Sequence, residues 1–219
     1  MRIFSYQPPA GLPPVIFQDK YYLAINKPSG LLSNPGRAAH TNDCALTRLQ
    51  SAFDEIHLVH RLDCDTSGVL IFAKQKKAEG ALKKQLQERK VQKTYHALAW
   101  GIPTQKKGSI ELKLASNPDD IPLQKVDADG KEAVTHYTIL ESNPEQNIAL
   151  LELRPLTGRT HQLRVHLDAI GHPILGDPFY GHPESQNKKP RLCLHAKTLK
   201  FKHPFTHKEI IIDTSTSFA

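Results

Sequence analysis

With 219 residues, 39% of them hydrophobic, the chain is long enough to bury the core of one domain, or of one domain with two lobes. Its three cysteines form no CxxC pair, no apolar run reaches the length of a membrane span, and the N-terminus lacks a signal peptide's apolar stretch. We therefore expect a cytoplasmic protein with no disulfide framework and no membrane partner. The net charge of +7, from 29 Lys and Arg against 22 Asp and Glu, favours RNA or DNA as a partner over a basic surface that serves only solubility.

The pattern of apolar and turn residues predicts a proline-rich, extended arm over residues 1–14 and a folded domain over residues 15–219. In chain order, the expected elements are strand, turn and strand over 15–25, a helix over 43–53, a strand over 69–73, a helix over 74–90, a strand over 93–100, a hairpin over 133–140 and 147–156, a helix over 160–170, and strands over 191–203 and 208–215. Asp43 and Thr160 are the expected N-caps of the helices that they begin, and residues 101–131 are expected to be mostly irregular. Because strands outnumber helices and pair as hairpins, we expect an α+β fold with a mixed, mainly antiparallel sheet as its core and helices packed on it.

The helix expected over residues 74–90 has one apolar face and one basic face. Ala78, Leu82 and Leu86 recur four residues apart. The lysines on the opposite side are Lys76, Lys77, Lys83, Lys84 and Lys90. The sequence leaves two interpretations open, a solvated basic face and a face that contacts phosphates.

The sequence lacks the motifs of several enzyme classes. It contains no GxxxxGK[ST] phosphate loop, no GxGxxG, no GxSxG and no HExxH. His161 and His166 are five residues apart, which places them on different sides of a helix, and the other histidines are dispersed. We therefore expect chemistry performed by side chains, with no cofactor and no metal.

Ionisable side chains precede the buried strand expected over residues 69–73. Asp65 and the Thr-Ser-Gly that follows it suit the turn into this strand, with Asp65 as the acceptor of an Asx-turn. Asp63 is not needed for that turn. It is therefore a candidate catalytic residue.

Arg164 lies on the polar side of the helix expected over residues 160–170, one turn before Asp168. The simpler interpretation is an ion pair between these two residues, which would stabilise the helix by only tenths of a kcal/mol. The alternative is that Arg164 reaches a carboxylate elsewhere in the chain, with Asp63 as the first candidate.

A series of motifs runs from about residue 15 to the end of the chain. The most specific is HRLDCDTSG at 60–68. Its companions are NKPSGLL (26–32), KTYHALAWG (93–101), TGRTHQLRVHL (157–167), GHPILGDPFYG (171–181) and RLCLHAKTL (191–199). In this order and spacing they resemble the RluA family of RNA pseudouridine synthases. We expect a short, single-domain member, because the chain has no room for the S4 RNA-binding domain that some members carry.

The resemblance implies the pseudouridine synthase fold, with an active-site cleft across the sheet, and an isomerase that detaches uracil at N1, turns it and rejoins it at C5. It implies Asp63 as the nucleophile, Arg164 as the partner of its carboxylate, Tyr95 as a stacking platform for the base, Leu194 beside the base, and Arg61 as the residue that holds the RNA open. The reaction conserves atoms and oxidation state, so it needs no redox cofactor. Flipping the target base costs a few kcal/mol, and stacking on an aromatic ring returns about 1–3 kcal/mol. The implied partner is ribosomal RNA, transfer RNA or both, and we expect a monomer.

Two other classes of protein remain open at this point. A non-catalytic RNA-binding module would use Asp63 and Arg164 as a structural ion pair. A glycosidase acting on nucleosides usually needs two facing carboxylates, whereas Asp63 and Asp65 lie two residues apart in one expected turn.

Overall fold

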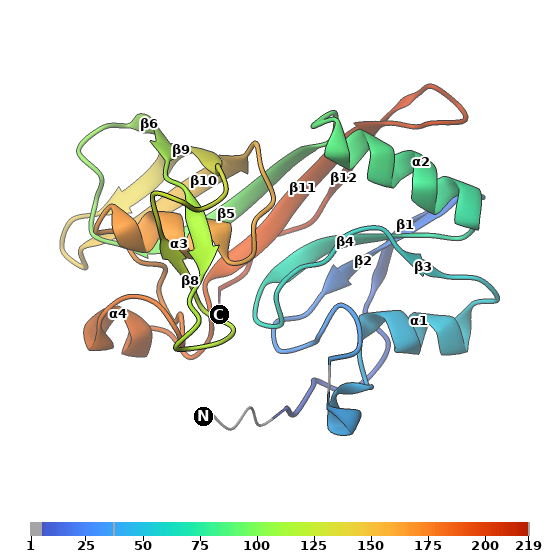
Figure 1. Cartoon of the computed structure of the whole chain (residues 1–219), viewed down its shortest axis with the longest axis horizontal. Helices are drawn as coiled ribbons and strands as arrows, with labels where there is room; N and C mark the ends of the chain where they lie inside the picture. Colours follow the sequence, from blue (N-terminus) through green and yellow to red (C-terminus); the bar gives the residue numbers. More distant parts are fainter. Residues whose placement is uncertain (1–5, 37, 219) are drawn as a thin grey trace. The chain divides into compact units, whose positions relative to one another are not determined.

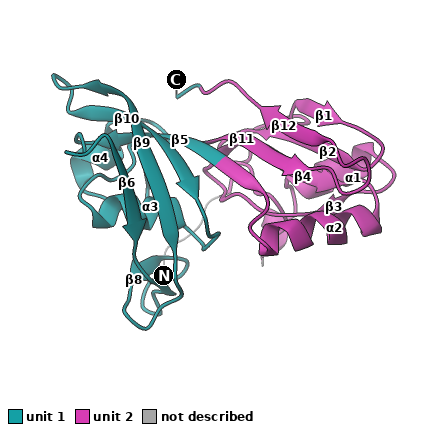
Figure 2. Cartoon of the chain, turned by 90° about the horizontal axis from the view of Figure 1, so that it is seen from above, with its two compact units in different colours: residues 1, 94–195, 217–219 teal, residues 2–93, 196–216 magenta. Residues whose placement is uncertain are grey.

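A computed structural model describes residues 6–36 and 38–218, and the chain divides into two compact units (Figure 1). Unit 1 is built mainly from Thr94–His195, and unit 2 from the chain up to Lys93 together with Ala196–Thr216 (Figure 2). Two strands, β5 (Gln92–Trp100) and β11 (Leu194–Lys202), have residues in both units.

Unit 2 is built on a sheet with the strand order β1-β2-β4-β11, in which β3 lies beside β4 and β12 beside β11. The remaining strands are β1 (Val15–Gln18), β2 (Tyr22–Lys27), β3 (His57–Leu58), β4 (Ser67–Ala73) and β12 (Glu209–Asp213). All residues of β4 are buried, because its apolar run is covered on both faces. Every residue of β2 pairs antiparallel with a residue of β4. The strand expected over residues 69–73 is confirmed and begins two residues earlier.

Two helices belong to unit 2, α1 (Ala45–Ala52) and α2 (Lys76–Gln87), together with a short 3₁₀ turn at Ala39–Thr41. The expected cap of α1 is wrong. Cys44, not Asp43, is the N-cap: its Sγ accepts from the Thr47 amide, and the Thr47 hydroxyl oxygen accepts from the Cys44 amide. The carboxylate of Asp43 instead binds the Arg48 side chain, with Oδ1 2.6 Å from Nε.

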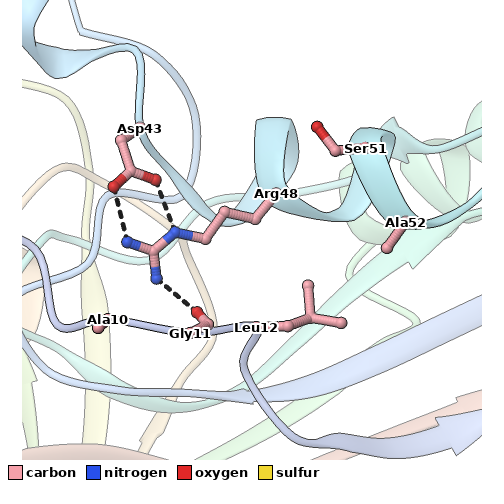
Figure 3. A pocket seen from close by; sticks show the side chains of 7 residues that line it. All are labelled: Ala10, Gly11, Leu12, Asp43, Arg48, Ser51 and Ala52. Atoms are coloured by element: carbon pink, nitrogen blue, oxygen red, sulfur yellow. Dashed lines mark hydrogen bonds and ion pairs between the residues drawn. The ribbon is translucent and has the colours of Figure 1, made fainter.

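Of the expected N-terminal arm, residues 6–14 are described, and Pro9 and Gly11 contact Arg48 of α1. Residues 1–5 of that arm lie outside the described part of the chain. Arg48 Nη1 donates to the carbonyl oxygens of Pro9 and Gly11, at 2.7 and 2.6 Å. Its Nε and Nη2 bind the two carboxylate oxygens of Asp43, so the guanidinium lies between the arm and Asp43 (Figure 3). One arginine thus fixes this part of the arm beside a hollow of about 570 Å³.

Unit 1 contains the strand order β5-β10-β9-β6 and a separate pair, β7-β8. Its further strands are β6 (Lys107–Glu111), β7 (Leu114–Ser116), β8 (Gln124–Val126), β9 (Val134–Asn143) and β10 (Ile148–Pro155). The hairpin formed by β9 and β10 is confirmed. Residues 101–131 are mostly irregular, as expected, but the three short strands β6 to β8, which were not predicted, lie among them. In β6 only Ile110 is buried, so this strand follows from its pairing with β9 and not from an apolar pattern.

The helices of unit 1 are α3 (Gln162–Ala169) and α4 (Pro183–Asn187). The helix expected over 160–170 is confirmed as α3, but its expected cap, Thr160, is wrong. His161 occupies the N-cap position with a left-handed backbone, φ 53°, and makes no side-chain capping hydrogen bond. Leu163 and Leu167, one helical turn apart, pack in the core of unit 1. The sequence did not predict α4.

The α+β fold class is confirmed. Every strand pair whose register is described is antiparallel, and helices accompany the sheet in both units. None of the described helices combines the length and the apolar character needed to cross a membrane.

Candidate active site

Asp63 lies in the turn between β3 and β4 and is partly buried. Its carbonyl oxygen accepts a hydrogen bond from the Thr66 amide at 3.2 Å, which closes a turn around Cys64 and Asp65. Gly68, at the start of β4, has φ 109°, and a Cβ there would lie 2.2 Å from the backbone carbonyl oxygen of Ala196. Only glycine therefore fits where the turn enters the strand.

Two serines after β2 hold the backbone on either side of Asp63. The Ser33 hydroxyl donates to the Leu62 carbonyl at 2.7 Å and accepts from the Leu62 amide at 3.0 Å. The Ser29 hydroxyl donates to the Asp65 carbonyl at 2.7 Å. The residues before and after the candidate nucleophile are thus anchored to a second segment of unit 2.

Lys27, the last residue of β2, extends this support and is fully buried. Its Nζ donates to the carbonyl oxygens of Pro28, Leu31 and Cys64, at 2.9, 2.6 and 2.8 Å. Burial lowers the pKa of Lys27 to about 8, although the nearby acidic side chains act in the opposite direction. The motif NKPSGLL contains this lysine but does not by itself predict its role. The signal for it is a charged residue at the end of a mainly apolar strand.

We expect the stability of the wild-type chain, relative to Lys27→Met, to increase between about pH 8 and about pH 10.4. The pKa of Lys27 is about 8 in the folded chain and about 10.4 in the unfolded chain. Between these pH values Lys27 keeps its proton in the unfolded chain but loses it in the folded chain. Proton binding therefore stabilises the unfolded chain less and less as the pH rises, and the free energy of unfolding of the wild type increases by roughly 3 kcal/mol relative to the variant. Urea unfolding of both proteins across this range measures the gain. A difference between them that stays constant with pH would contradict the assignment.

The two ionisable residues before Leu62 have different surroundings. Burial, with a further contribution from the cation of Lys93, lowers the pKa of His60 to about 4, so His60 is neutral at physiological pH. Its Nε2 lies 3.5 Å from the Ile71 amide, which places it against β4. Arg61, by contrast, is exposed. Of these two residues, Arg61 is therefore the one that a large substrate can reach.

Arg164 lies in α3 and is almost completely buried, with 1% of its side chain exposed. Nε donates to Asp177 Oδ2 and Nη2 to Asp177 Oδ1, both at 2.7 Å, and Asp177 is itself fully buried. These two nitrogen atoms therefore bind Asp177 and not Asp168, which the simpler expectation named as the partner of Arg164. Asp177 escaped sequence reasoning because it lies 13 residues away, beyond the turn that ends the helix, where helical periodicity no longer applies. The motif GHPILGDPFYG was the available signal.

Two aromatic residues surround the Arg164–Asp177 pair. The guanidinium carbon of Arg164 lies 5.0 Å from the ring centroid of Phe179 and 5.2 Å from that of Tyr180. Asp177 Oδ1 also accepts from the amides of Phe179 and Tyr180, at 2.9 and 3.2 Å. His161 Nδ1 lies 2.8 Å from the Tyr180 hydroxyl. The polar side of α3 around Arg164 is therefore part of a buried polar network.

Tyr95 and Leu194 belong to the same hydrophobic cluster of unit 1. Tyr95 lies in β5, opposite Leu153 of β10, and is partly buried. Leu194, the first residue of β11, is 3% exposed. The packing that buries Leu194 also supports the ring of Tyr95.

The candidate residues are divided between the two units. Asp63 and Arg61 belong to unit 2, whereas Tyr95, Arg164 and Leu194 belong to unit 1. Among residues 6–36 and 38–218, no three His, Cys, Asp or Glu side chains gather in a way that would hold a metal ion.

Comparisons with known proteins agree with the resemblance. A family model described as RNA pseudouridylate synthase matches residues 21–169, which include Asp63, Tyr95 and Arg164. The dual-specificity RNA pseudouridine synthase RluA of Vibrio parahaemolyticus is 45% identical over 94% of this chain and 85% of its own length. The protein of that name from Haemophilus influenzae is 41% identical over 100% of both chains. The solved structure of human RNA pseudouridylate synthase domain containing 1 matches with a TM-score of 0.80 and 27% identity, covering 95% of this chain and 86% of the human one.

Proposed function

We propose that Asp63 is the nucleophile of this chain, which belongs to the RluA family of RNA pseudouridine synthases. The chain is therefore an isomerase that acts on uridine in RNA. The observation that carries this assignment is the anchoring of the turn. The side chains of Lys27, Ser29 and Ser33 hold the backbone on both sides of Asp63. A carboxylate on such a rigid support keeps its position while the base is detached and rejoined.

Arg164 is proposed as the partner of the Asp63 carboxylate, a role that comes from the motif HQLRVH. Arginine suits it because the guanidinium stays charged and binds a carboxylate through its planar fork. The support in unit 1 is the two-bond pair with Asp177, which fixes the orientation of the guanidinium. In this proposal Asp177 positions Arg164 and takes no part in the chemistry itself.

Tyr95, Leu194 and Arg61 are proposed to bind the substrate. An aromatic face accepts a flipped base by stacking, and a buried leucine packs against the base edge. The attachment of Tyr95 and Leu194 to the unit 1 core supports both roles. The exposure of Arg61 supports its proposed contact with the RNA strand that the base has left.

Replacement of Tyr95 separates stacking from other roles of this side chain. We expect Tyr95→Phe to keep most of the RNA affinity, because the aromatic face remains. Tyr95→Ala should lose about 1–3 kcal/mol of binding free energy, which is about 5- to 150-fold in affinity. Binding of a fluorescent RNA stem-loop to each variant measures the effect. Equal affinities and equal rates for the two variants would contradict the stacking role.

As substrates we propose uridines in both ribosomal and transfer RNA, modified in the cytoplasm by a monomer. The net charge of +7 suits a polyanion, and the curated relatives carry the name dual-specificity. The test is to map pseudouridines in both classes of RNA from a strain lacking this gene. The same strain is then supplied with the wild-type gene or with Asp63→Asn. We expect the missing pseudouridines to return only with the wild type. Their presence in the deletion strain, or their return with the variant, would contradict the proposal.

Membership of a family of RNA pseudouridine synthases argues against both alternative functions, the non-catalytic RNA-binding module and the nucleoside glycosidase.

A further inference from the structure

A hollow with a volume of about 590 Å³ opens in unit 1, beside the loop that carries Asp177. Its lining includes Gly176, Pro178, Gln186, Asn187, Lys188 and Lys189. None of the lining side chains is acidic, two are cationic, and Asn187 adds an amide donor. Ammonium and amide groups are the donors that proteins present to phosphate oxygens. The hollow therefore has the chemistry of an anion site.

The two lysines of this hollow keep their charge available. Lys188 is exposed and Lys189 is partly buried. Within the described chain, neither lies within ion-pair distance of a carboxylate. The contact of Lys188 is with an aromatic ring, its Nζ lying 6.0 Å from the centroid of Trp100. A cation without an acidic partner attracts an anionic ligand more strongly than one already paired.

The lysines in α2 and just after it differ in this respect. Lys76 and Lys83 both bind Glu79, with Nζ to oxygen distances of 2.5 and 2.6 Å. Lys84 and Lys90 both lie by Glu88, at 3.9 and 2.7 Å. Most of the basic face that the sequence singled out is thus neutralised by carboxylates, which favours a solvated face over a phosphate contact. No such neutralising carboxylate is described for Lys188 and Lys189.

The hollow is joined rigidly to the network around Arg164. Gly176 has φ 70°, and a Cβ there would lie 1.9 Å from the carbonyl oxygen of Arg191, so the backbones of the two loops touch. The Gly176 amide also donates to the Ser185 carbonyl at 2.9 Å. The next residue, Asp177, holds Arg164. The loop that lines the hollow is therefore the same loop that binds Arg164.

We propose that this hollow binds the phosphodiester backbone of the substrate RNA through Lys188 and Lys189. The RNA strand would be fixed relative to Arg164 by contacts that carry no sequence information, while the base enters the site. The proposal rests on RNA being the substrate and not on the assignment of Asp63 as the nucleophile.

The test compares two double variants that change the net charge equally, Lys188→Gln with Lys189→Gln and Lys83→Gln with Lys84→Gln. The probe is a fluorescent RNA stem-loop that the wild type converts, and its Kd is measured from low to high salt. We expect the 188–189 variant to bind on the order of tenfold more weakly at low salt. The slope of log affinity against log salt should fall by about two, because each of the two lysines would neutralise one phosphate. The 83–84 variant should bind almost as the wild type does.

A single-turnover rate at saturating RNA distinguishes binding from catalysis. We expect the 188–189 variant to reach the wild-type rate once RNA saturates it, and Lys188→Arg with Lys189→Arg to restore both affinity and salt dependence. Equal weakening by both glutamine pairs would show a general charge effect and would overturn the proposal. Unchanged affinity of the 188–189 variant, or a reduced rate at saturation, would overturn it as well. Because binding is measured separately, these results stand whatever the outcome for Asp63→Asn.

Discussion

Asp63→Asn is expected to abolish pseudouridine formation while leaving the fold and the RNA affinity largely intact. The amide has nearly the shape of the carboxylate but lacks the charge and the nucleophilic oxygen. Loss of an essential nucleophile should reduce the single-turnover rate by a factor on the order of 10³ or more. The measurement is the release of tritium from C5-labelled uridine in RNA, together with a filter-binding assay.

Asp65→Asn is the matched control, because it removes the same charge from the same turn. Asparagine is a good acceptor for an Asx-turn, so this variant should keep most of the activity. A turnover near that of the wild type in Asp63→Ala would refute the nucleophile assignment. If Asp63 instead served only as a structural partner for a buried arginine, its replacement would mainly unfold the protein. Thermal melting of the variants distinguishes these outcomes.

The strands of the fold could be predicted where apolar periodicity alone determines them. The run Val69–Ala73 is buried on both faces of the sheet, and β9 and β10 alternate across a polar turn. Such patterns depend only on neighbours in sequence. The strand β6 could not be found in this way, because it has one buried side chain and is held by hydrogen bonds to β9.

The candidate site shows the same division between local and distant causes. Asp63 could be singled out because the local turn has no need of it. The supports of this turn were not predictable, since Lys27 and Ser33 act on backbone carbonyls that lie about thirty residues away or more. Every residue has a backbone carbonyl that can accept a hydrogen bond, so the type of the accepting residue does not reveal such a bond. The helix wheel favoured Asp168 as the partner of Arg164 because a wheel compares only residues of one helix, and Asp177 lies beyond the end of α3.

Asp177→Asn is expected to destabilise the protein by about 3–5 kcal/mol, because it removes the charge of the carboxylate that binds the buried guanidinium of Arg164 through two bonds. An asparagine oxygen can still accept from the Phe179 and Tyr180 amides, so the loss reports the charge more than the turn. Urea unfolding measures the change. The matched control is Asp168→Asn, one turn from Arg164 on the same helix, for which we expect a change within about 0.5 kcal/mol.

A double-mutant cycle isolates the pair itself. Arg164→Met alone leaves the Asp177 carboxylate buried without its partner and should also be strongly destabilising, whereas the double variant leaves neither charge uncompensated. We therefore expect the double variant to lose much less stability than the sum of the two single losses, with a coupling of roughly 1–3 kcal/mol. Additive losses would show that the two side chains do not stabilise each other. Substantial coupling would mean that buried Arg164 is stabilised by a carboxylate that lies outside its helix.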